Sequence, residues 1–281
     1  PNIVPVHALS TTPAGRPSLV MKRIEGQTFA RFLRSLGPAP WRAATLDEVL
    51  GIFLKVCDAV AFAHSRGVVH RDLKPQNVMV GAFGQVYVMD WGIALRFADG
   101  APVLPEEMAA RGVIGTPMYM APEQVLRGEK AITVRTDVFQ LGAILYEIVT
   151  GRPPFRGHDV YSTLGQVALG RVTPPDEVAP ERAMPASLGR IALKALARDP
   201  ADRYASVLDL KHDVENFLRG EERFPTQTFA PGVKVIVEGQ EGVAAYVILA
   251  GRCVASRGEG SGRAVLREMG PGDTFGETSV F

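Results

Sequence analysis

Apolar residues recur at the spacing of an α-helix in several stretches of the chain. The longest begins after Thr45, which stands three residues before Glu48 in the pattern of a capping box, and continues to Gly67, an expected helix-ending glycine. The run 138–149 is interrupted by one glutamine and one glutamate and is typical of a buried helix. We therefore predict helices over 46–66, 137–150, 188–197 and 206–218.

Shorter stretches favour strands. Residues 18–24 alternate loosely between apolar and polar types, and two β-rich pieces over 77–80 and 85–89 flank a turn of the hairpin type at 81–84. Little periodicity is visible over 92–116. We expect that segment to be a long irregular loop, a kind of loop that is usually functional.

The pattern changes near the end of the chain. From Phe229 onward, frequent glycines alternate with short apolar strands such as 245–249, as in all-β domains. We place the boundary in the charged segment 220–223, which gives domains over 1–222 and 223–281. The expected fold class is α+β, with a mainly helical first domain and an all-β second one.

Composition narrows the classes of function. The 281 residues are 46% hydrophobic and 22% charged, with a net charge of +1, so no strong field favours nucleic acid or an anionic membrane. Cys57 and Cys253 lie far apart in apolar stretches and are expected to be buried free thiols in a reducing compartment. The longest apolar run is too short to cross a bilayer, and no signal peptide is visible, so we expect a cytoplasmic protein.

Three motifs follow one another in the first domain. The sequence HRDLKPQN occupies 70–77, DWG follows at 90–92, and APE closes the long loop at 121–123. In this order and context they resemble the catalytic loop, the metal-binding DFG element and the APE element of protein kinases. The resemblance implies a protein-kinase C-lobe with a hinge strand, of the bacterial eukaryotic-like (Hanks) type.

The chemistry explains the residue types, since phosphoryl transfer needs positioning and charge neutralisation more than covalent help. By resemblance, Asp72 accepts or orients the proton of the substrate hydroxyl, and Lys74 neutralises the transferring γ-phosphate of ATP. Asn77 and Asp90 offer oxygen ligands to Mg²⁺, a hard cation that prefers oxygen. Trp91 replaces the usual phenylalanine and is expected to pack the base of the loop in its place.

The substrate class follows from two features. Lys74, two residues after Asp72, and the sequence GTPMY over 115–119 resemble serine/threonine kinases rather than tyrosine kinases. In that family the Thr116 hydroxyl bridges the catalytic aspartate and lysine. Thr116 taken alone is also consistent with a simple turn residue before a proline.

Other resemblances are structural. Asp137 resembles the residue that caps the backbone of the catalytic loop from a buried helix. Arg203 resembles the partner of Glu123 in a buried ion pair, whose loss on one side costs on the order of 3–5 kcal/mol. These residues are expected to serve as scaffold and not as catalytic groups.

The ATP site is only partly visible. The sequence VMKRI over 20–24 resembles the hinge, with Met21 as gatekeeper and with the Lys22 carbonyl and the Ile24 N–H facing adenine. Met79 would form the apolar floor. These residues taken alone are also consistent with an ordinary buried strand.

No glycine-rich loop, Val-Ala-Ile-Lys-type lysine or helix glutamate partner precedes the hinge, and the opening sequence PNIV resembles the segment after that helix. We therefore expect a fragment of a longer kinase that lacks most of its N-lobe and is inactive by itself. Between 90 and 116 there is no Ser, Thr or Tyr. We hypothesise that Glu106 or Glu107 pairs with Arg71 in place of a loop phosphate, although a solvated acidic loop is an equally open alternative.

The second domain has a resemblance of its own. Its glycine and apolar spacing, ending in GPGDTFGE over 270–277, resembles the β-roll of cyclic-nucleotide-binding domains. By that resemblance, the N–H of Gly276 faces the cyclic phosphate and Glu277 accepts from the ribose 2′-hydroxyl. The family's phosphate-binding arginine would lie beyond Phe281. A module used only for docking is the alternative.

Together these resemblances imply an ATP- and Mg²⁺-dependent kinase of protein Ser/Thr hydroxyls, regulated by cAMP or cGMP. The implied partners are protein substrates, ATP and the cyclic nucleotide, without nucleic acid and without a membrane segment in these residues. The alternative is a pseudokinase scaffold whose β-roll is a docking module.

Overall fold

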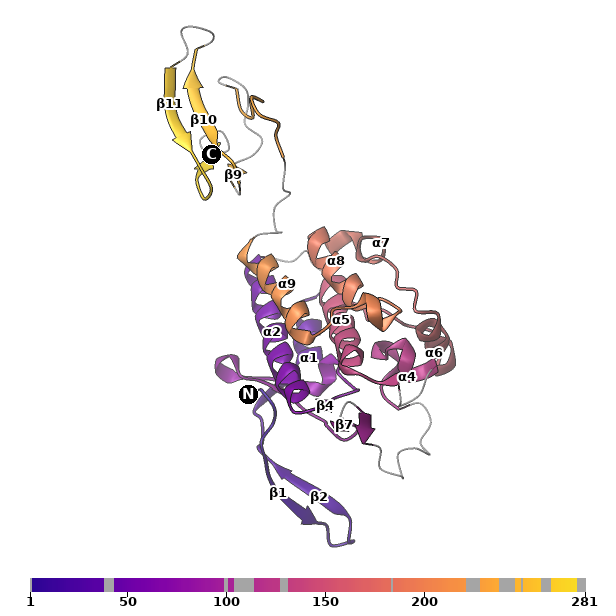
Figure 1. Cartoon of the computed structure of the whole chain (residues 1–281). Coiled ribbons are helices and arrows are strands. Elements are labelled where there is room, and N and C mark those ends of the chain that lie inside the picture. The colour runs from indigo at the N-terminus through magenta and orange to yellow at the C-terminus, as the bar shows by residue number, and fades with distance from the viewer. Residues whose placement is uncertain are drawn as a thin grey trace. The chain divides into compact units, whose positions relative to one another are not determined.

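The computed structural model describes residues 2–37, 43–98, 101–103, 114–126, 131–182, 184–220, 228–237, 246–248, 250–258 and 264–276 (Figure 1). The chain divides into two compact units, Pro1–Pro225 and Thr226–Phe281. The first is mainly helical with short strands and the second is a small β structure, so the chain has the expected α+β class. Residues 221–223 of the expected boundary segment lie outside the described residues.

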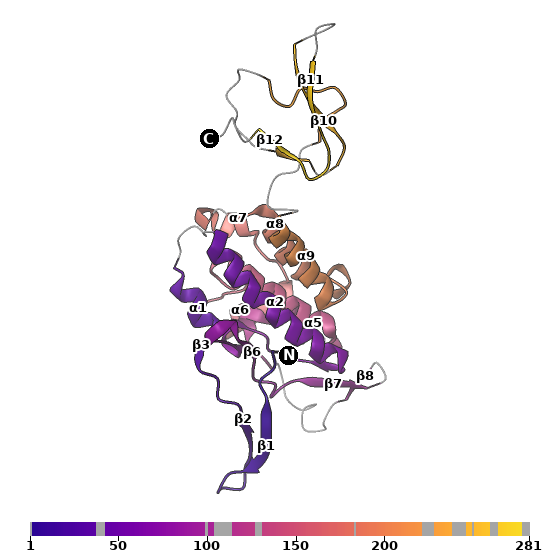
Figure 2. The ribbon, with the colours of Figure 1, turned by 90° about the vertical axis from the view of Figure 1, so that its left-hand side faces the viewer.

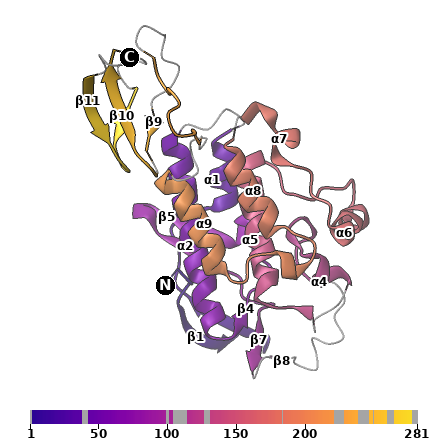
Figure 3. The same ribbon diagram turned by 45° about the horizontal axis from the view of Figure 1, so that its top comes forward.

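Helices form most of the first unit. The longest, α2, packs along α9, and α5 packs closely against α8 (Figure 3). Their bounds, with the short 3-10 helices last, are α1 Phe29–Ser35, α2 Ala43–Ser65, α4 Pro122–Leu126, α5 Val134–Thr150, α6 Val160–Leu169, α7 Pro175–Val178, α8 Ala186–Ala195, α9 Val207–Arg219, and Pro75–Asn77, Ala82–Gly84, Pro117–Tyr119, Pro180–Arg182 and Pro200–Asp202.

The helix starts differ from the expected ones. Helix α2 already includes Ala43, so Thr45 lies inside the helix and is not its N-cap; the two alanines before Thr45 are strong helix formers that extend the first turn. Helix α5 starts at Val134, because Thr133 caps it in a box with Thr136. Helix α8 lies two residues earlier than expected at both ends.

The helix ends follow the glycines. After α2, Gly67 adopts the left-handed conformation with φ of 68°, and a Cβ there would come 2.8 Å from the carbonyl oxygen of Phe97. Gly151 ends α5 and Gly220 ends α9 in the same conformation. The predicted helix-ending roles of Gly67 and Gly151 are confirmed, whereas α9 ends at Arg219, one residue later than expected.

Two small sheets carry the loops between helices. One sheet has the order β3 (Gly26–Thr28), β5 (Val78–Gly81) and β6 (Val86–Val88); the other has the order β4 (Val68–Val69), β7 (Leu95–Ala98) and β8 (Ala101–Val103). All neighbours are antiparallel. The expectation of an irregular loop from residue 92 onward is therefore wrong for β7 and β8. Those strands are too short to show a period of two. Strand β7 forms by pairing with the distant β4, and β8 forms by pairing with β7.

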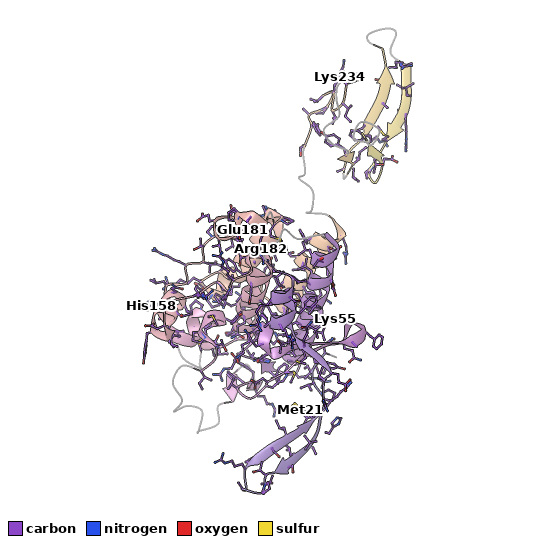
Figure 4. All side chains as sticks on the ribbon, turned by 180° about the vertical axis from the view of Figure 1, so that it is seen from behind. Met21, Lys55, His158, Glu181, Arg182 and Lys234 are labelled. Carbon is purple, nitrogen blue, oxygen red and sulfur yellow. The ribbon has the colours of Figure 1, made fainter. Side chains whose placement is uncertain are left out.

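A two-stranded hairpin projects from the helical unit (Figure 2). Strand β1 (Val6–Thr11) pairs with β2 (Pro17–Met21), so the expected strand over 18–24 ends at Met21, and its partner was not predicted. Both strands are exposed along nearly their whole length, which excludes an ordinary buried strand. Met21 lies where the hairpin meets the helical unit (Figure 4).

The core of the first unit surrounds α5, whose residues are buried almost throughout, as its apolar run predicts. Gly142 allows this packing, because a Cβ at that position would lie 2.6 Å from the Cβ of Ala195 on α8. Cys57 is buried in this core. In the described part of the chain, none of the helices combines the length and apolar character that crossing a bilayer requires.

The second unit consists of paired strands. Strand β10 (Cys253–Arg257) pairs with β11 (Ala264–Met269), and β9 (Tyr246–Val247) pairs with β12 (Thr274–Phe275), all antiparallel. Of the expected strand over 245–249, Tyr246 and Val247 form a strand and Ile248 does not, while residues 245 and 249 lie outside the described residues. Cys253 is half-buried and not buried as expected, because its strand belongs to a two-stranded pair with little covering it.

Candidate active site

The motif at 70–77 forms a loop between β4 and β5, held from below by α5. Asp137, whose side chain is fully buried, accepts the backbone N–H of His70 at 2.8 Å through Oδ2 and the N–H of Arg71 at 2.9 Å through Oδ1. His64 Nε2 lies 2.8 Å from the same Oδ2. One helix residue therefore fixes the start of the loop, at a point where Arg71 has a positive φ of 73°.

Two buried glutamines hold the next part of the loop. Gln140, one turn after Asp137 on α5, accepts the Leu73 N–H at 2.8 Å and donates to the Arg71 carbonyl at 2.6 Å. Gln124 on α4 donates to the same carbonyl at 2.9 Å. The left-handed Arg71 thus has its carbonyl oxygen satisfied twice, which stabilises a conformation that is costly for a non-glycine residue.

His70 links the loop to the DWG segment. Its Nδ1 accepts the Asp72 N–H at 3.2 Å, so Nε2 carries the proton and donates to the Met89 carbonyl at 3.0 Å. The Trp91 ring lies 4.5 Å from the His70 ring, and its Nε1 donates to the Val88 carbonyl. Trp91 is half-buried against the core, as expected for the residue that packs the base of this loop.

Three donors converge on the carboxylate of Asp72. Lys74 Nζ lies 2.6 Å from Oδ2, Asn77 Nδ2 donates to Oδ2 at 3.1 Å and to the Asp72 carbonyl at 2.9 Å, and the Thr116 hydroxyl donates to Oδ1 at 2.8 Å. Lys74 also donates to Thr116 Oγ1 at 2.5 Å. The structure therefore brings together four expected site residues that lie up to 44 positions apart. Thr116 is more than a turn residue before proline.

Asp90 lies two residues after the end of β6. It has a positive φ of 60°, and its side chain is exposed. Its neighbour Met89 donates its N–H to the Asn77 carbonyl at 2.8 Å, which couples the two expected metal ligands through the backbone. Because Asn77 uses its amide nitrogen on Asp72, its amide oxygen remains for a cation. An amide oxygen and an exposed carboxylate form a donor set that fits Mg²⁺.

The expected adenine-contacting residues are less closely gathered. Lys22 donates its backbone N–H to Pro5 and its Nζ to the Tyr87 hydroxyl at 3.1 Å. Tyr87 is the cross-strand partner of Met79. The segment after Met21 is thereby tied to the strand pair that carries the expected apolar floor, whereas Ile24 is half-buried and has no hydrogen bond described.

A buried hydrogen-bonded pair, Tyr119 and Glu147, lies next to the segment that contains Thr116. The Tyr119 hydroxyl donates to Glu147 Oε2 at 2.6 Å. Burial raises the pKa of Tyr119, and the nearby Glu147 charge adds to this effect. Burial likewise raises the pKa of Glu147, although the hydrogen bond from Tyr119 acts in the opposite direction.

The expected scaffold pair of Glu123 and Arg203 is formed. The two groups meet in a bidentate arrangement at 2.7 and 2.8 Å, with both side chains almost fully buried, and Thr136 adds a hydrogen bond to Glu123 at 2.8 Å. Arg203 also donates to three backbone carbonyls. The pair fastens the end of the long loop to the segment between α8 and α9.

The second unit shows only part of its expected site. Gly276 has a positive φ of 89°, and the ring of Phe275 before it stacks on Tyr246 with 5.3 Å between centroids. The Phe229 ring packs edge-on against the same tyrosine. Glu277, like Glu106 and Glu107 of the first unit, lies outside the described residues.

Comparison with known proteins now adds the decisive observation. The protein kinase domain model matches residues 1–214. The chain belongs to the protein kinase domain family. The cyclic nucleotide-binding domain model matches residues 226–281 of the same chain.

Bacterial kinases are among the similar proteins. The serine/threonine-protein kinase PknD of Chlamydia felis is 36% identical over 252 residues, which cover 81% of this chain and 26% of the relative. PknB of Mycobacterium tuberculosis is 37% identical over 211 residues, covering 75% and 32% respectively. A probable serine/threonine-protein kinase of Corynebacterium efficiens is 39% identical over 202 residues, covering 71% and 29%. The kinase-family chain thus spans about a quarter to a third of the length of these relatives.

Sequence reasoning missed several residues that shape this kinase site. Gln124 and Gln140 were not singled out, although a glutamine directly after the APE motif and another inside an apolar helix are both unusual places for a polar side chain. His64 also went unnoticed, whereas Gln140 and Glu147 were noticed only as interruptions of the apolar run 138–149. For Gln140 and Glu147 the signal was a polar residue within an apolar run, which predicts a buried hydrogen bond but not its partner.

Proposed function

We propose that this chain carries the catalytic centre of a serine/threonine protein kinase that transfers the γ-phosphate of ATP to Ser and Thr hydroxyls of proteins. The observation that supports it most is the closed set of contacts among Asp72, Lys74 and Thr116, at 2.5 to 2.8 Å. Such a set places a proton acceptor and a cation side by side, which is what a transferring phosphoryl group and an attacking hydroxyl require.

The roles follow from the contacts. Asp72 orients the substrate hydroxyl and accepts its proton, because three donors hold the carboxylate in one orientation. Lys74 neutralises charge on the transferring group from its place beside Asp72. Thr116 is a positioning residue in this scheme, since its hydroxyl joins both groups and holds the substrate-facing loop against them.

Asn77 and Asp90 are the residues that would hold Mg²⁺. When bound, the metal supplies charge neutralisation on the phosphate oxygens of ATP. Asn77 orients its amide oxygen by donating its nitrogen to Asp72, and Asp90 is carried next to it by the Met89 hydrogen bond. We further propose that Met21, the Lys22 carbonyl, the Ile24 N–H and Met79 form the adenine site.

Transfer of labelled phosphate from ATP to a generic protein substrate, with Mg²⁺ and the full-length protein, tests the proposal. Asp72→Asn should reduce incorporation to the blank. Thr116→Ala should reduce it by about ten- to a hundredfold and Thr116→Ser should restore most of it, since the serine hydroxyl can make the same bridge. Incorporation in Asp72→Asn equal to that of the unaltered protein would refute the assignment. No incorporation by the unaltered protein would favour a pseudokinase scaffold.

We also propose that the 281 residues by themselves turn over little ATP, because they contain no glycine-rich loop and no lysine of the Val-Ala-Ile-Lys type. The same assay on this chain and on the full-length protein compares the two directly. Turnover by the 281 residues at the rate of the full-length protein would contradict this.

We propose that the second unit regulates the kinase. We propose that it binds cAMP or cGMP, with the N–H of Gly276 toward the cyclic phosphate and Glu277 toward the ribose. The cyclic nucleotide-binding domain match over residues 226–281 supports this. Calorimetric titration of the full-length protein should show binding that Glu277→Ala weakens by about tenfold or more. Without binding of either nucleotide, the unit would be a docking module.

A further inference from the structure

A cavity of about 550 Å³ opens in the first unit, distinct from the Asp72 cluster. Its walls come from the end of α5, the proline-rich loop that follows it, α6, the segment after α6 and α7. Its size is within the range of ligand pockets in proteins. None of the kinase-site residues discussed above lines it.

The lining is strongly basic. Arg152, Arg156 and Arg171 all line the cavity, and no Asp or Glu does. No carboxylate among the described residues forms an ion pair with any of these three side chains, all of which are exposed. The whole chain has a net charge of only +1, so three arginines around one cavity do not reflect a generally basic protein.

Neighbouring charges do not neutralise this cluster. Burial lowers the pKa of Arg182, a neighbour of the cavity, and the positive charge of Arg152 adds to that effect while Glu181 opposes it. Burial raises the pKa of Tyr146 in the wall to about 12, with Arg152 opposing and Glu177 reinforcing the shift. Glu177 and Glu181, the acidic groups that act on Tyr146 and Arg182, do not line the cavity.

The walls are held in place by hydrogen bonds. The Tyr146 hydroxyl donates to the Thr173 carbonyl at 2.8 Å, which ties α5 to the segment that carries Arg171. The N–H of Arg156 donates to Gln166 Oε1 on α6 at 2.9 Å. Because two of the three arginine-bearing segments are fastened to neighbouring helices, the backbone that carries these side chains is held in place before any ligand binds.

The surroundings of the cavity indicate a polypeptide as its occupant. Helix α6 exposes Val160, Tyr161 and Leu169, at 59%, 85% and 60% of their surfaces, and Leu169 also lines the cavity. His158, just before α6, lies at the edge of the unit near this helix (Figure 4). A basic pocket beside exposed apolar side chains suits a chain with one anionic side chain between apolar ones.

We propose that the cavity, which we call the arginine pocket (Arg152, Arg156 and Arg171), binds a phosphoserine or phosphothreonine side chain of a protein partner. A phosphate ester presents three acceptor oxygens and close to two negative charges, and guanidinium groups bind it in bidentate fashion. Three arginines without carboxylate partners match that charge better than they match a single carboxylate. The exposed face of α6 would bind the apolar residues beside the phosphate. This binding function is separate from the proposed phosphotransfer and needs no ATP.

Fluorescence anisotropy of a labelled phosphothreonine peptide with flanking leucines tests the proposal on the full-length protein without ATP. We expect saturable binding, at least tenfold weaker for the unphosphorylated peptide and progressively weaker with added salt. Changing all three arginines of the arginine pocket to Gln should weaken binding by tenfold or more. A matched variant, Arg16→Gln/Arg31→Gln/Arg252→Gln, removes the same charge from exposed sites elsewhere and should bind as the unaltered protein does.

Further arms separate the alternatives. Replacing the three pocket arginines by Lys keeps the charge and loses the bidentate geometry, so binding should fall by an intermediate amount while thermal unfolding stays unchanged. Asp72→Asn should bind the phosphopeptide normally, which separates this proposal from the kinase assignment. Equal binding by the pocket and matched variants would overturn the proposal. So would pocket-dependent binding to phosphatidylserine vesicles with none to the phosphopeptide, since the site would then be a membrane contact.

Discussion

Replacing Asp137 by Asn should destabilise the first unit strongly, although it alters no group that would touch substrate. The carboxylate accepts two backbone N–H groups at 2.8 and 2.9 Å and is fully buried. An asparagine of the same shape has only one acceptor oxygen. Its NH₂ group would face one of the two N–H donors, His70 or Arg71, and leave it unsatisfied.

The magnitude follows from two losses. One charge-assisted hydrogen bond contributes about 1.5–3 kcal/mol, and a buried donor left without an acceptor costs about 1–3 kcal/mol. Together they predict a loss of about 2.5–6 kcal/mol, a large share of the 5–15 kcal/mol that stabilises a typical domain. With a urea dependence of about 3 kcal/mol per M, the unfolding midpoint should fall by about 1–2 M.

Urea unfolding followed by helical circular dichroism measures this change, because the helices described all belong to the first unit. Asp58→Asn is the matched control. Asp58 pairs with Lys211 at 2.6 Å near the surface, and its loss should cost only about 0.2–1 kcal/mol. If both variants shifted the midpoint equally, the account of Asp137 as the support of the catalytic loop would be wrong.

Three further predictions rest on single contacts. Arg203→Met should lower the free energy of unfolding by about 3–5 kcal/mol, because it leaves Glu123 buried without its partner. In the same urea assay, adding Glu123→Leu should recover part of the lost free energy. No recovery would contradict the role of the pair. In the native state one thiol, that of half-buried Cys253, should react with a disulfide reagent, and both thiols should react after denaturation. Cys57 is protected because burial raises the pKa of its thiol. Reaction of both thiols in the native state would refute this. Hydrogen bonds from Ser162 lower the pKa of Asp159. The carboxylate therefore stabilises the fold above its unfolded pKa, and this stabilisation is lost as the pH falls through the folded pKa. Asp159→Ala should make the free energy of unfolding less dependent on pH in that acid range, and an unchanged slope would contradict the assignment.

The helices were the most predictable part of the fold, because their apolar periodicity and glycine ends are local signals. Errors appeared where the local signal was weak or the partner distant. Thr45 resembled a cap, but the alanines before it extend α2. Strand β7 has only four residues and forms because β4, from the other side of the catalytic loop, supplies its hydrogen-bond partners.

The site was predictable in its residue types but not in its support. Asp72, Lys74, Asn77 and Thr116 come together as the motifs imply, since each motif encodes a spacing that the family uses. Gln140 could not be assigned in advance. A glutamine in an apolar helix must find a partner, but its partners, the Arg71 carbonyl and the Leu73 N–H, are 67 or more positions away. Only the packed structure identifies them.

This support makes the catalytic loop depend on the core. The loop contains a left-handed Arg71, and side chains of α4 and α5 bond the backbone groups of His70, Arg71 and Leu73. Such a conformation persists only where the surroundings determine it fully. Because the same helix α5 presents Asp137 and Gln140 one turn apart and packs through Gly142 against α8, any shift of α5 moves the loop backbone with it. The position of Asp72 relative to Lys74 is therefore set by helix packing as much as by the loop sequence.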